Sequence, residues 1–352
     1  MIDPLSRSQV LAWPSARLWT ILSTLILQVA VLISTRPASF THPGLHHFRH
    51  ALRAHHFAIL AAALVFIACV CAYLVSQIVV LKAAVYNAPG RQVLNARRLP
   101  NFIQQDPDSP SLIDFRQHLH GVLEADYSDS LSKAIAIRQW VRRQQSQDAA
   151  IWLVRARKNN ENPHRLLEDQ RRGVPGACRR FSYIFLGALL SAGFDARIIS
   201  FTNSLRRRDV ESHVDVEVWI EEIHQWVLFD PTCDAVVLVD GCLASALDVH
   251  EAVAAGELDS ITFERNGSEL EPHPRVEVYA RHCRHLFVAM SNAVFDGYGV
   301  RLLGSKSISF LHYSREAQYP ALRKQLLLGI SANGLLLSVV FWTWTFLSMT
   351  PE

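Results

Sequence analysis

Three short stretches decide the fold of this chain: Gly-Val-Pro-Gly-Ala-Cys-Arg-Arg-Phe (173–181), His-Val-Asp-Val-Glu-Val-Trp (213–219) and Trp-Val-Leu-Phe-Asp-Pro-Thr (226–232). They carry Cys178, His213 and Asp230, in that order. A thiol, an imidazole and a carboxylate suffice for nucleophilic acyl chemistry, because the thiolate attacks, the histidine moves protons and the carboxylate orients the histidine. We therefore predict these three residues as catalytic, provided that the fold brings them together.

Cys178 opens a predicted helix. Phe181, Phe185 and Leu189 recur every four residues along it, and Gly193 stands where a C-terminal glycine belongs. The unpaired amides and the dipole at a helix N-terminus favour an anion, which raises the thiolate fraction of a cysteine placed there. The alternative is a small buried cysteine that only fills the core.

Two strands follow, and in the first of them valines alternate with polar residues, which gives it two distinct faces. A hairpin with its turn centred on Glu221 and Glu222 places His213 directly opposite Asp230, with their Cβ atoms roughly 5 Å apart. A slip of one residue would move the two side chains to different faces. His224, close to the hairpin tip, is the alternative base.

Another helix is expected just before these stretches, near 128–145. Asp129 or Ser128 can cap it, and apolar residues recur along it at close to helical spacing. We expect Arg138, Arg142 and Arg143 to lie on the solvated face of this helix.

Three uncharged apolar runs stand outside this region, at 18–34, 57–81 and 326–348. About 20 apolar residues are needed to cross the hydrocarbon layer of a membrane. The second and third runs meet that length, whereas the first is at the short end and has a secretory signal as its alternative. No small-x-small cleavage site follows the first run, so we predict three transmembrane helices.

The predicted organisation therefore has two membrane regions around one soluble domain. Its parts are an N-terminal membrane region at 1–81 with helices at about 18–34 and 57–81, a soluble domain at 82–324 with its core at about 128–234, and a C-terminal transmembrane helix at 325–352.

Basic residues near the apolar runs predict the orientation, because short loops rich in Lys and Arg stay in the cytoplasm. A cytoplasmic soluble domain places nine such residues inside and three outside. The inner set is Arg7, Arg17, Lys82, Arg91, Arg97, Arg98, Arg315, Arg323 and Lys324, and the outer set is Arg36, Arg49 and Arg53. We predict an integral protein of the cell (inner or plasma) membrane that contacts lipid.

Composition sets further limits. The net charge of +3 gives no indication of nucleic-acid binding. Six cysteines show neither a regular disulfide framework nor a zinc-like cluster, so we predict no metal and no cofactor. A histidine-rich loop is expected at 35–56, either at the lipid headgroups or as a metal-binding or pH-responsive segment.

The motifs resemble the transglutaminase-like (papain-like) cysteine enzyme superfamily, of the membrane-anchored bacterial type. The similarity covers about Ser128 to Asp234 and includes the three opening stretches, together with Ile-Arg-Gln-Trp-Val (137–141) and Ala-Gly-Phe-Asp-Ala-Arg (192–197). It implies an α+β fold in which the nucleophile helix packs on an antiparallel sheet. It also implies Cys178 as nucleophile, His213 as base and then acid, and Asp230 as the residue that orients His213.

The resemblance leaves the reaction open between hydrolysis and amine transfer. Cross-linking members often have an aromatic residue directly after the cysteine, where this chain has Arg179, so we expect a hydrolase or peptidase acting on protein, peptide or another amide. The oxyanion hole needs the Cys178 amide and one further donor, with Gln170, Trp152 and Gln139 as candidates. The alternative is a non-catalytic accessory subunit of a membrane assembly, such as a polysaccharide synthesis or export complex.

Overall fold

The computed structural model describes residues 43–78, 84–145, 162–174, 176–206, 208–265, 267–270, 273–295, 300–302, 305–307 and 309–349. The predicted membrane helix at 18–34 and the oxyanion-hole candidate Trp152 lie outside these residues. Contacts divide the chain into two compact units, and all three predicted catalytic residues belong to the unit formed by residues 62–339.

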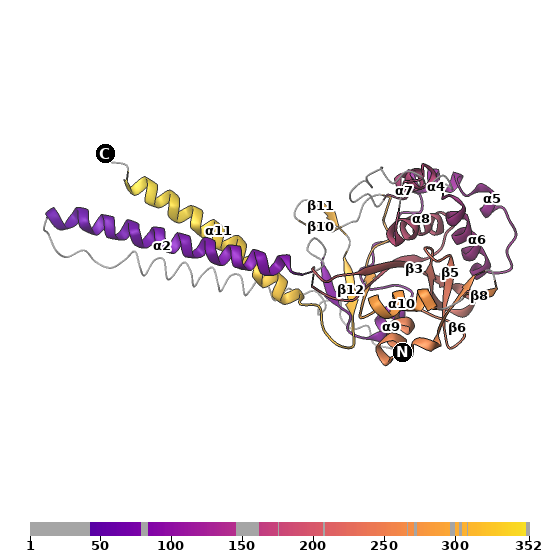
Figure 1. Cartoon of the computed structure of the whole chain (residues 1–352). Coiled ribbons are helices and arrows are strands. Elements are labelled where there is room, and N and C mark those ends of the chain that lie inside the picture. Colours follow the sequence, from indigo (N-terminus) through magenta and orange to yellow (C-terminus); the bar gives the residue numbers. More distant parts are fainter. Residues whose placement is uncertain are drawn as a thin grey trace, which may run out of the picture. The chain divides into compact units, whose positions relative to one another are not determined.

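Ten strands among the described residues of this unit form one mixed sheet (Figure 1). The order of neighbours is β1-β12-β9-β2-β3-β4-β5-β7-β8, with β6 paired to β5. The pairs are antiparallel except β1 with β12. The strands are β1 (Val85–Asn87), β2 (Ala196–Thr202), β3 (Ser212–Ile220), β4 (Gln225–Asp230), β5 (Ala235–Val239), β6 (Cys242–Leu243), β7 (Ile261–Arg265), β8 (Ser268–Leu270), β9 (His285–Ala289) and β12 (Phe310–Tyr313), beside a separate hairpin of β10 (Val300–Leu302) and β11 (Ser305–Ser307).

Helices cover both faces of the sheet. One face presents Val216, Val218 and Phe229 to a helical layer of α4 (Pro110–Gln117), α5 (His120–Leu123), α6 (Ser130–Arg143), α7 (Pro163–Arg171) and α8 (Cys178–Ser191). The other face presents Ile199 and Leu228 to α3 (Arg91–Asn95), α9 (Ala246–Ala255) and α10 (His273–His282). Short 3-10 turns span Glu221–Ile223 and Leu258–Ser260. The predicted α+β class, with a largely antiparallel sheet, is confirmed.

The predicted helix at Cys178 is confirmed as α8. Every residue from Arg180 to Ser191 is buried, because the helix lies between the sheet and the other helices of its layer. Gly193 ends the helix in a left-handed conformation, with φ of 87°, and its amide donates to the Leu190 carbonyl at 3.1 Å. This is the role that the sequence predicted for the glycine.

The hairpin of β3 and β4 forms, but its predicted register is wrong by two residues. Trp219 pairs with Trp226, and the same register continued along the strands places Asp215, rather than His213, opposite Asp230. A shift of two residues keeps every side chain on its predicted face. His213 therefore remains on the same face as Asp230, as its diagonal neighbour.

The longer turn explains this register. Glu221–Ile223 form a 3-10 turn, and His224 follows in the left-handed region with φ of 50°. The connection therefore occupies four residues, whereas the prediction assumed a turn centred one residue earlier. His224 serves as a turn residue at the hairpin end, away from the Asp230 end of the strand.

The capping prediction for α6 is confirmed, because the Asp129 carboxylate accepts from the Ser132 amide at 2.6 Å. The expectation for Arg138 is wrong: its side chain is fully buried, and its Nε donates to Asp234 Oδ1 at 2.9 Å. Arg138 lies one turn from Ala134 on the face that packs into the core, and the loop after β4 supplies a carboxylate there.

Among the described residues, two helices are long and apolar enough to cross a membrane, α2 (Pro43–Ser76) and α11 (Ala321–Met349), with candidate spans at Phe57–Ser76 and Arg323–Thr343. The expected loop at 35–56 is wrong from Pro43 onward, because α2 begins there. Within residues 62–339, Ser331 Oγ of α11 donates to the Ala68 carbonyl of α2 at 3.0 Å. The small residue Gly334 lies close to the Leu64 carbonyl, as in helix pairs that pack through small side chains.

Candidate active site

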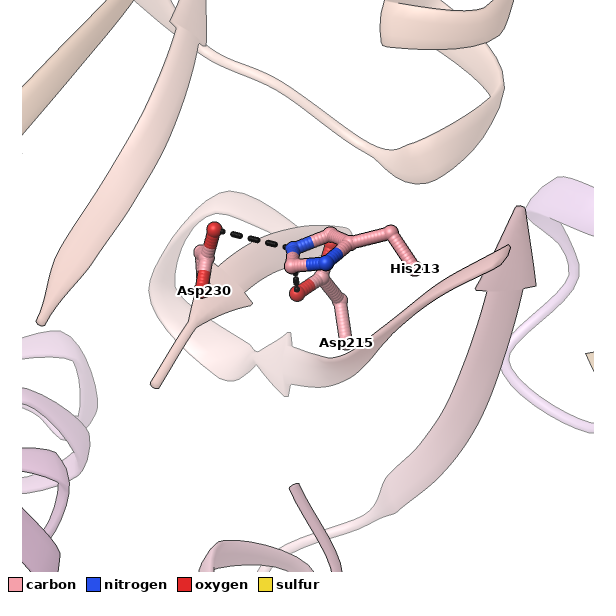
Figure 2. A group of neighbouring side chains, drawn as sticks. All are labelled: His213, Asp215 and Asp230. Carbon is pink, nitrogen blue, oxygen red and sulfur yellow. Dashed lines mark hydrogen bonds and ion pairs between the residues drawn. The ribbon is translucent and has the colours of Figure 1, made fainter. Parts of the chain in front are cut away.

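A buried histidine between two carboxylates is the central feature of the site (Figure 2). His213 Nε2 lies 3.1 Å from Asp230 Oδ2 in a hydrogen bond, and 3.1 Å from Asp215 Oδ1 in an ion pair. All three side chains project from the face of β3 and β4 that α9 and α10 cover. The predicted partnership of His213 and Asp230 is thus formed, although by diagonal rather than direct opposition.

The two carboxylates have different surroundings. Asp230 Oδ1 accepts from the amides of Thr232 at 2.8 Å and Cys233 at 2.9 Å, in the turn after β4. Asp215 has no backbone donor of this kind among the described residues and accepts from the Tyr279 hydroxyl at 2.8 Å. Tyr279 also lies 3.3 Å from Asp230 Oδ2, so one phenol contacts both acids.

These surroundings give the two carboxyls different pKa values. Burial opposes ionisation of both, but His213 and the Cys233 amide outweigh it at Asp230 and lower the pKa of that carboxyl to about 2. At Asp215 burial dominates and raises the pKa to about 6, and the nearby Asp230 charge acts in the same direction. Asp230 is therefore the permanent anion, and Asp215 gains or loses a proton close to neutral pH.

His213 responds to both charges. Burial alone would lower the pKa of its imidazole, but Asp215 and Asp230 together raise that pKa well above its ordinary value. Nε2 carries the proton that points at the carboxylates, since both contacts are made to that nitrogen. Nδ1 has no hydrogen-bond partner among the described residues, so it is the nitrogen left to exchange a proton with a thiol.

Cys178 is the first residue of α8 and is partly exposed. No side chain caps this helix start, so its terminal amides stay open to a negative charge at the sulfur. Gly176, two residues before Cys178, leaves room for the Arg180 side chain. A Cβ at this position would lie 2.6 Å from that side chain. Arg180 in turn donates to the Val174 carbonyl and fixes the loop that leads into the nucleophile position.

Cys178 and His213 are not joined by a hydrogen bond in the described part of the chain. The Cys178 sulfur makes no hydrogen bond to any described residue, His213 included. Its helix packs on the valine face of β3, whereas His213 projects from the other face, near the start of that strand. Catalytic hydrogen bonds are often long in unliganded enzymes and shorten when substrate binds.

A second cysteine lies beside the two acids. Cys233 donates its amide to Asp230, and burial, followed by the Asp230 charge, raises the pKa of its thiol to about 12. A thiol of that acidity is almost entirely protonated at neutral pH and is a poor nucleophile. Cys233 is therefore a structural residue of the turn after β4, and Cys178 remains the candidate nucleophile.

The candidates for the second oxyanion-hole donor fare differently. Gln170 is buried on α7, and its amide nitrogen donates to the Val141 carbonyl at 2.6 Å, so it ties α7 to the end of α6. Gln139 is partly buried on α6. No hydrogen bond joins either side chain to Cys178 within the described residues, and the second donor stays a prediction without a side chain assigned to it.

Sequence reasoning missed Asp215 and Tyr279. Asp215 could have been found, since it stands two residues after His213 on a strand of period two and therefore on the same face. Tyr279 carries no such signal, because its place depends on how α10 crosses that face of the sheet. Both side chains are fully buried.

One imidazole nitrogen and two carboxylate oxygens within 4.8 Å of one another are also a donor set of the kind that binds divalent cations. A cation would require Nε2 without its proton. The hydrogen bond from Nε2 to Asp230, with the Tyr279 hydroxyl spanning both acids, fits a shared proton network instead. We therefore interpret the cluster as a charged acid–base group.

Two cavities of about 430 and 630 Å³ are present in the described part of the chain, and neither is lined by Cys178, His213 or Asp230. The smaller is lined by residues of α6, the turn after α8 and the β3–β4 turn. The larger lies where α2 and α11 meet the loop between β2 and β3.

Comparison with known proteins supports the domain assignment. Residues 118–231 match the family model of the transglutaminase-like superfamily, and this stretch contains the helix of Cys178 and the strands of His213 and Asp230. No curated protein and no solved structure matches the chain. The matched stretch begins ten residues before the predicted core and ends close to its predicted limit. Residues 118–231 of this chain therefore form a transglutaminase-like superfamily domain.

Proposed function

We propose that this protein is a membrane-anchored cysteine enzyme that cleaves or transfers an acyl group through a thioester on Cys178. The observation that carries the proposal is the hydrogen bond from His213 Nε2 to Asp230, which orients the imidazole and leaves Nδ1 free. The match of residues 118–231 to a superfamily with this order of residues supports it.

The first half of the reaction forms the thioester. Nδ1 of His213 takes the Cys178 proton, and the thiolate attacks the carbonyl carbon of an amide. The oxyanion that forms is stabilised by the Cys178 amide at the start of α8. His213 then gives the same proton to the leaving nitrogen, the carbon–nitrogen bond breaks, and the amine departs.

The second half releases the acyl group. A water molecule, or an amine in a transfer reaction, gives a proton to His213 Nδ1 while its oxygen or nitrogen attacks the thioester carbon. The Cys178 sulfur leaves as thiolate and regains its proton from His213. In both halves Asp230 stabilises the imidazolium that forms. Hydrolysis is the reaction we favour, since Arg179 stands where cross-linking enzymes often have an aromatic residue.

The membrane location of the proposed enzyme is supported by α2 and α11. Only 22% and 17% of the residues in their candidate spans are buried, which is the opposite of a soluble core helix. Exposed residues in these spans include Phe66, Leu336, Val339 and Trp342. Charge asymmetry of the flanking loops favours a domain on the cytoplasmic side of the cell membrane. A substrate at that surface, a protein, a peptide or another amide, follows from this location.

A second function is favoured by one observation. Cys178 makes no hydrogen bond to His213, and its helix packs on the opposite face of β3. A domain in which the two groups never meet would act as a non-catalytic accessory subunit of a membrane assembly, for example in polysaccharide synthesis or export. Formation of the thioester separates the two functions.

The test is acyl transfer from p-nitrophenyl acetate to the full-length protein in detergent, followed by intact-mass spectrometry and peptide mapping. We expect an acetyl group on Cys178 that water removes, and removal that the primary amine cadaverine does not accelerate. A Cys178→Ala variant should lose the adduct, whereas Cys242→Ala, at an exposed cysteine away from the site, should retain it.

The outcomes distinguish the candidates. If cadaverine accelerates removal of the acetyl group from Cys178, the proposed reaction is amine transfer and not hydrolysis. No adduct on Cys178 above that on Cys242 would favour the accessory subunit.

A further inference from the structure

A pocket of about 630 Å³ lies at one end of both candidate membrane helices. Leu74 lines it from the last turn of α2, Ile78 from just after that helix, and Leu327 from the first turns of α11. The third wall is the loop between β2 and β3, which belongs to the transglutaminase-like domain. The pocket therefore joins apolar helix surface to the soluble domain.

Three arginines give this pocket its charge. Arg206 and Arg208 come from the β2–β3 loop and Arg323 from α11, with Asp209 as the one acidic residue among the described lining residues. Arg206 and Arg323 have no ion-pair partner in the described part of the chain, and Arg208 donates to the Tyr73 hydroxyl at 3.4 Å. Three exposed guanidinium groups around one hollow suit an anion with several oxygen acceptors.

The position of the pocket at the ends of the two apolar helices indicates which kind of anion it binds. The candidate span of α2 ends at Ser76 and that of α11 begins at Arg323, so the pocket lies where the apolar segments stop. In a bilayer this is the depth of the headgroup phosphates, and the leucines of the pocket would face the adjoining glycerol and acyl region. The arrangement of cationic rim and apolar wall therefore matches a lipid better than a soluble phosphate.

We propose that this pocket binds the phosphate headgroup of an anionic membrane phospholipid and so fixes the transglutaminase-like domain at the membrane surface. The inference rests on the proposed membrane anchoring and is independent of the proposed thioester chemistry. Lipid bound between Arg206 and Arg323 would link the β2–β3 loop to α11. His213 lies near the other end of that loop, at the start of β3.

The test titrates the full-length protein in dodecyl maltoside with phosphatidylglycerol or phosphatidylcholine, with bound lipid counted by native mass spectrometry. We expect wild type to bind phosphatidylglycerol about tenfold more tightly than phosphatidylcholine. An Arg206→Gln/Arg323→Gln variant should lose most of this preference, at about threefold per arginine. The matched control is Arg143→Gln/Arg165→Gln, which removes equal charge from two exposed arginines of α6 and α7 outside the pocket.

Three results would overturn the proposal: unchanged phosphatidylglycerol binding in the pocket variant, an equal loss in the control, or displacement of the lipid by millimolar inorganic phosphate. Thermal unfolding of each variant establishes that the protein is folded. Anchoring is tested separately by alkaline carbonate extraction of membranes. A protein that stays in the membrane but shows no lipid preference refutes the pocket alone, whereas a protein released by carbonate refutes the anchoring.

Discussion

The two faces of the β3–β4 hairpin are built from the same strands and yet serve different purposes. One face carries Val216, Val218 and Phe229, all without exposed surface, against the helix of Cys178. The other carries the ionisable side chains of His213, Asp215 and Asp230, which are also buried. A strand of period two thus places the apolar core on one side and the acid–base group on the other.

This difference shows how buried charge is accommodated. The polar face also contains an Arg197–Glu217 ion pair, with 2.6 Å between Arg197 Nη2 and Glu217 Oε2, and the Ala246 amide donates to the other Glu217 oxygen. That pair has its charges balanced one to one. His213 instead faces two acids, one of them with a raised pKa, which is the kind of imbalance found at functional sites. The imbalance, rather than burial, distinguishes the candidate site from its structural neighbour.

The largest expected effect comes from removing the permanent anion on the polar face. Asp230→Asn should slow acetylation of Cys178 by roughly 10³-fold or more, because the imidazolium loses the carboxylate that stabilises it. The measurement is the rate of adduct formation from p-nitrophenyl acetate. A rate within tenfold of wild type would assign the orienting role to Asp215.

The apolar face should respond in stability instead. Phe229→Ala removes a buried ring that packs 5.6 Å from the ring of Phe185 in α8, and should lower the free energy of unfolding by about 3–5 kcal/mol. Chemical denaturation in detergent measures this change. Alkylation of Cys178 in the protein that remains folded should keep its wild-type rate, and a parallel loss would mean that the two faces are not separable.

The Asp215→Asn variant tests whether Asp215 has the higher pKa of the two buried carboxyls. With a pKa of about 6 when folded and about 3.9 when unfolded, Asp215 keeps its proton longer in the folded state, so stability falls as the pH rises from about 4 to about 6. Asparagine removes that loss, so the variant should gain up to about 3 kcal/mol relative to wild type above pH 6 and nothing below pH 4. It should also lower the pKa of His213, because one of the two raising charges is gone.

Thermal unfolding of both proteins between pH 4 and pH 8 measures the difference. Parallel profiles of wild type and Asp215→Asn would show that Asp215 does not titrate in this range. Asp215→Glu serves as the control, since it keeps a carboxyl group at the position.

The smallest effect is expected at the link between α8 and β3. Ser182 Oγ donates to the Val214 carbonyl at 2.7 Å, one residue from His213. Ser182→Ala should cost about 1 kcal/mol of stability and change the acetylation rate by less than about threefold. A much greater loss of rate with unchanged stability would indicate that this hydrogen bond sets the distance between Cys178 and His213.

Much of the architecture could be predicted because local rules decide it. The stop of α8 at Gly193, the cap at Asp129 and the two faces of β3 each depend on a few neighbouring residues. The hairpin register could not be predicted, since it depends on the left-handed conformation that His224 adopts in a four-residue connection. The burial of Arg138 depends on Asp234, a partner 96 positions away.

The candidate site was predictable to the same extent. The pairing of His213 with Asp230 survived a wrong register because an error of two residues preserves the face. The position of Tyr279 at the site could not be predicted, since α10 packs over the sheet only through long-range contacts. Whether Cys178 meets His213 depends on tertiary packing around the start of α8, which neither composition nor periodicity encodes.

The most direct test of this account is the rate of Cys178 alkylation by iodoacetamide at pH 7 in wild type and His213→Gln, with exposed Cys242 as the internal reference. We predict that Cys178 of wild type reacts about tenfold faster than Cys242 or more, because a cysteine that passes its proton to a histidine is the better nucleophile. In His213→Gln, Cys178 should react no faster than Cys242. Equal rates of the two cysteines in wild type would contradict the account, because Cys178 would then have no working partner in His213.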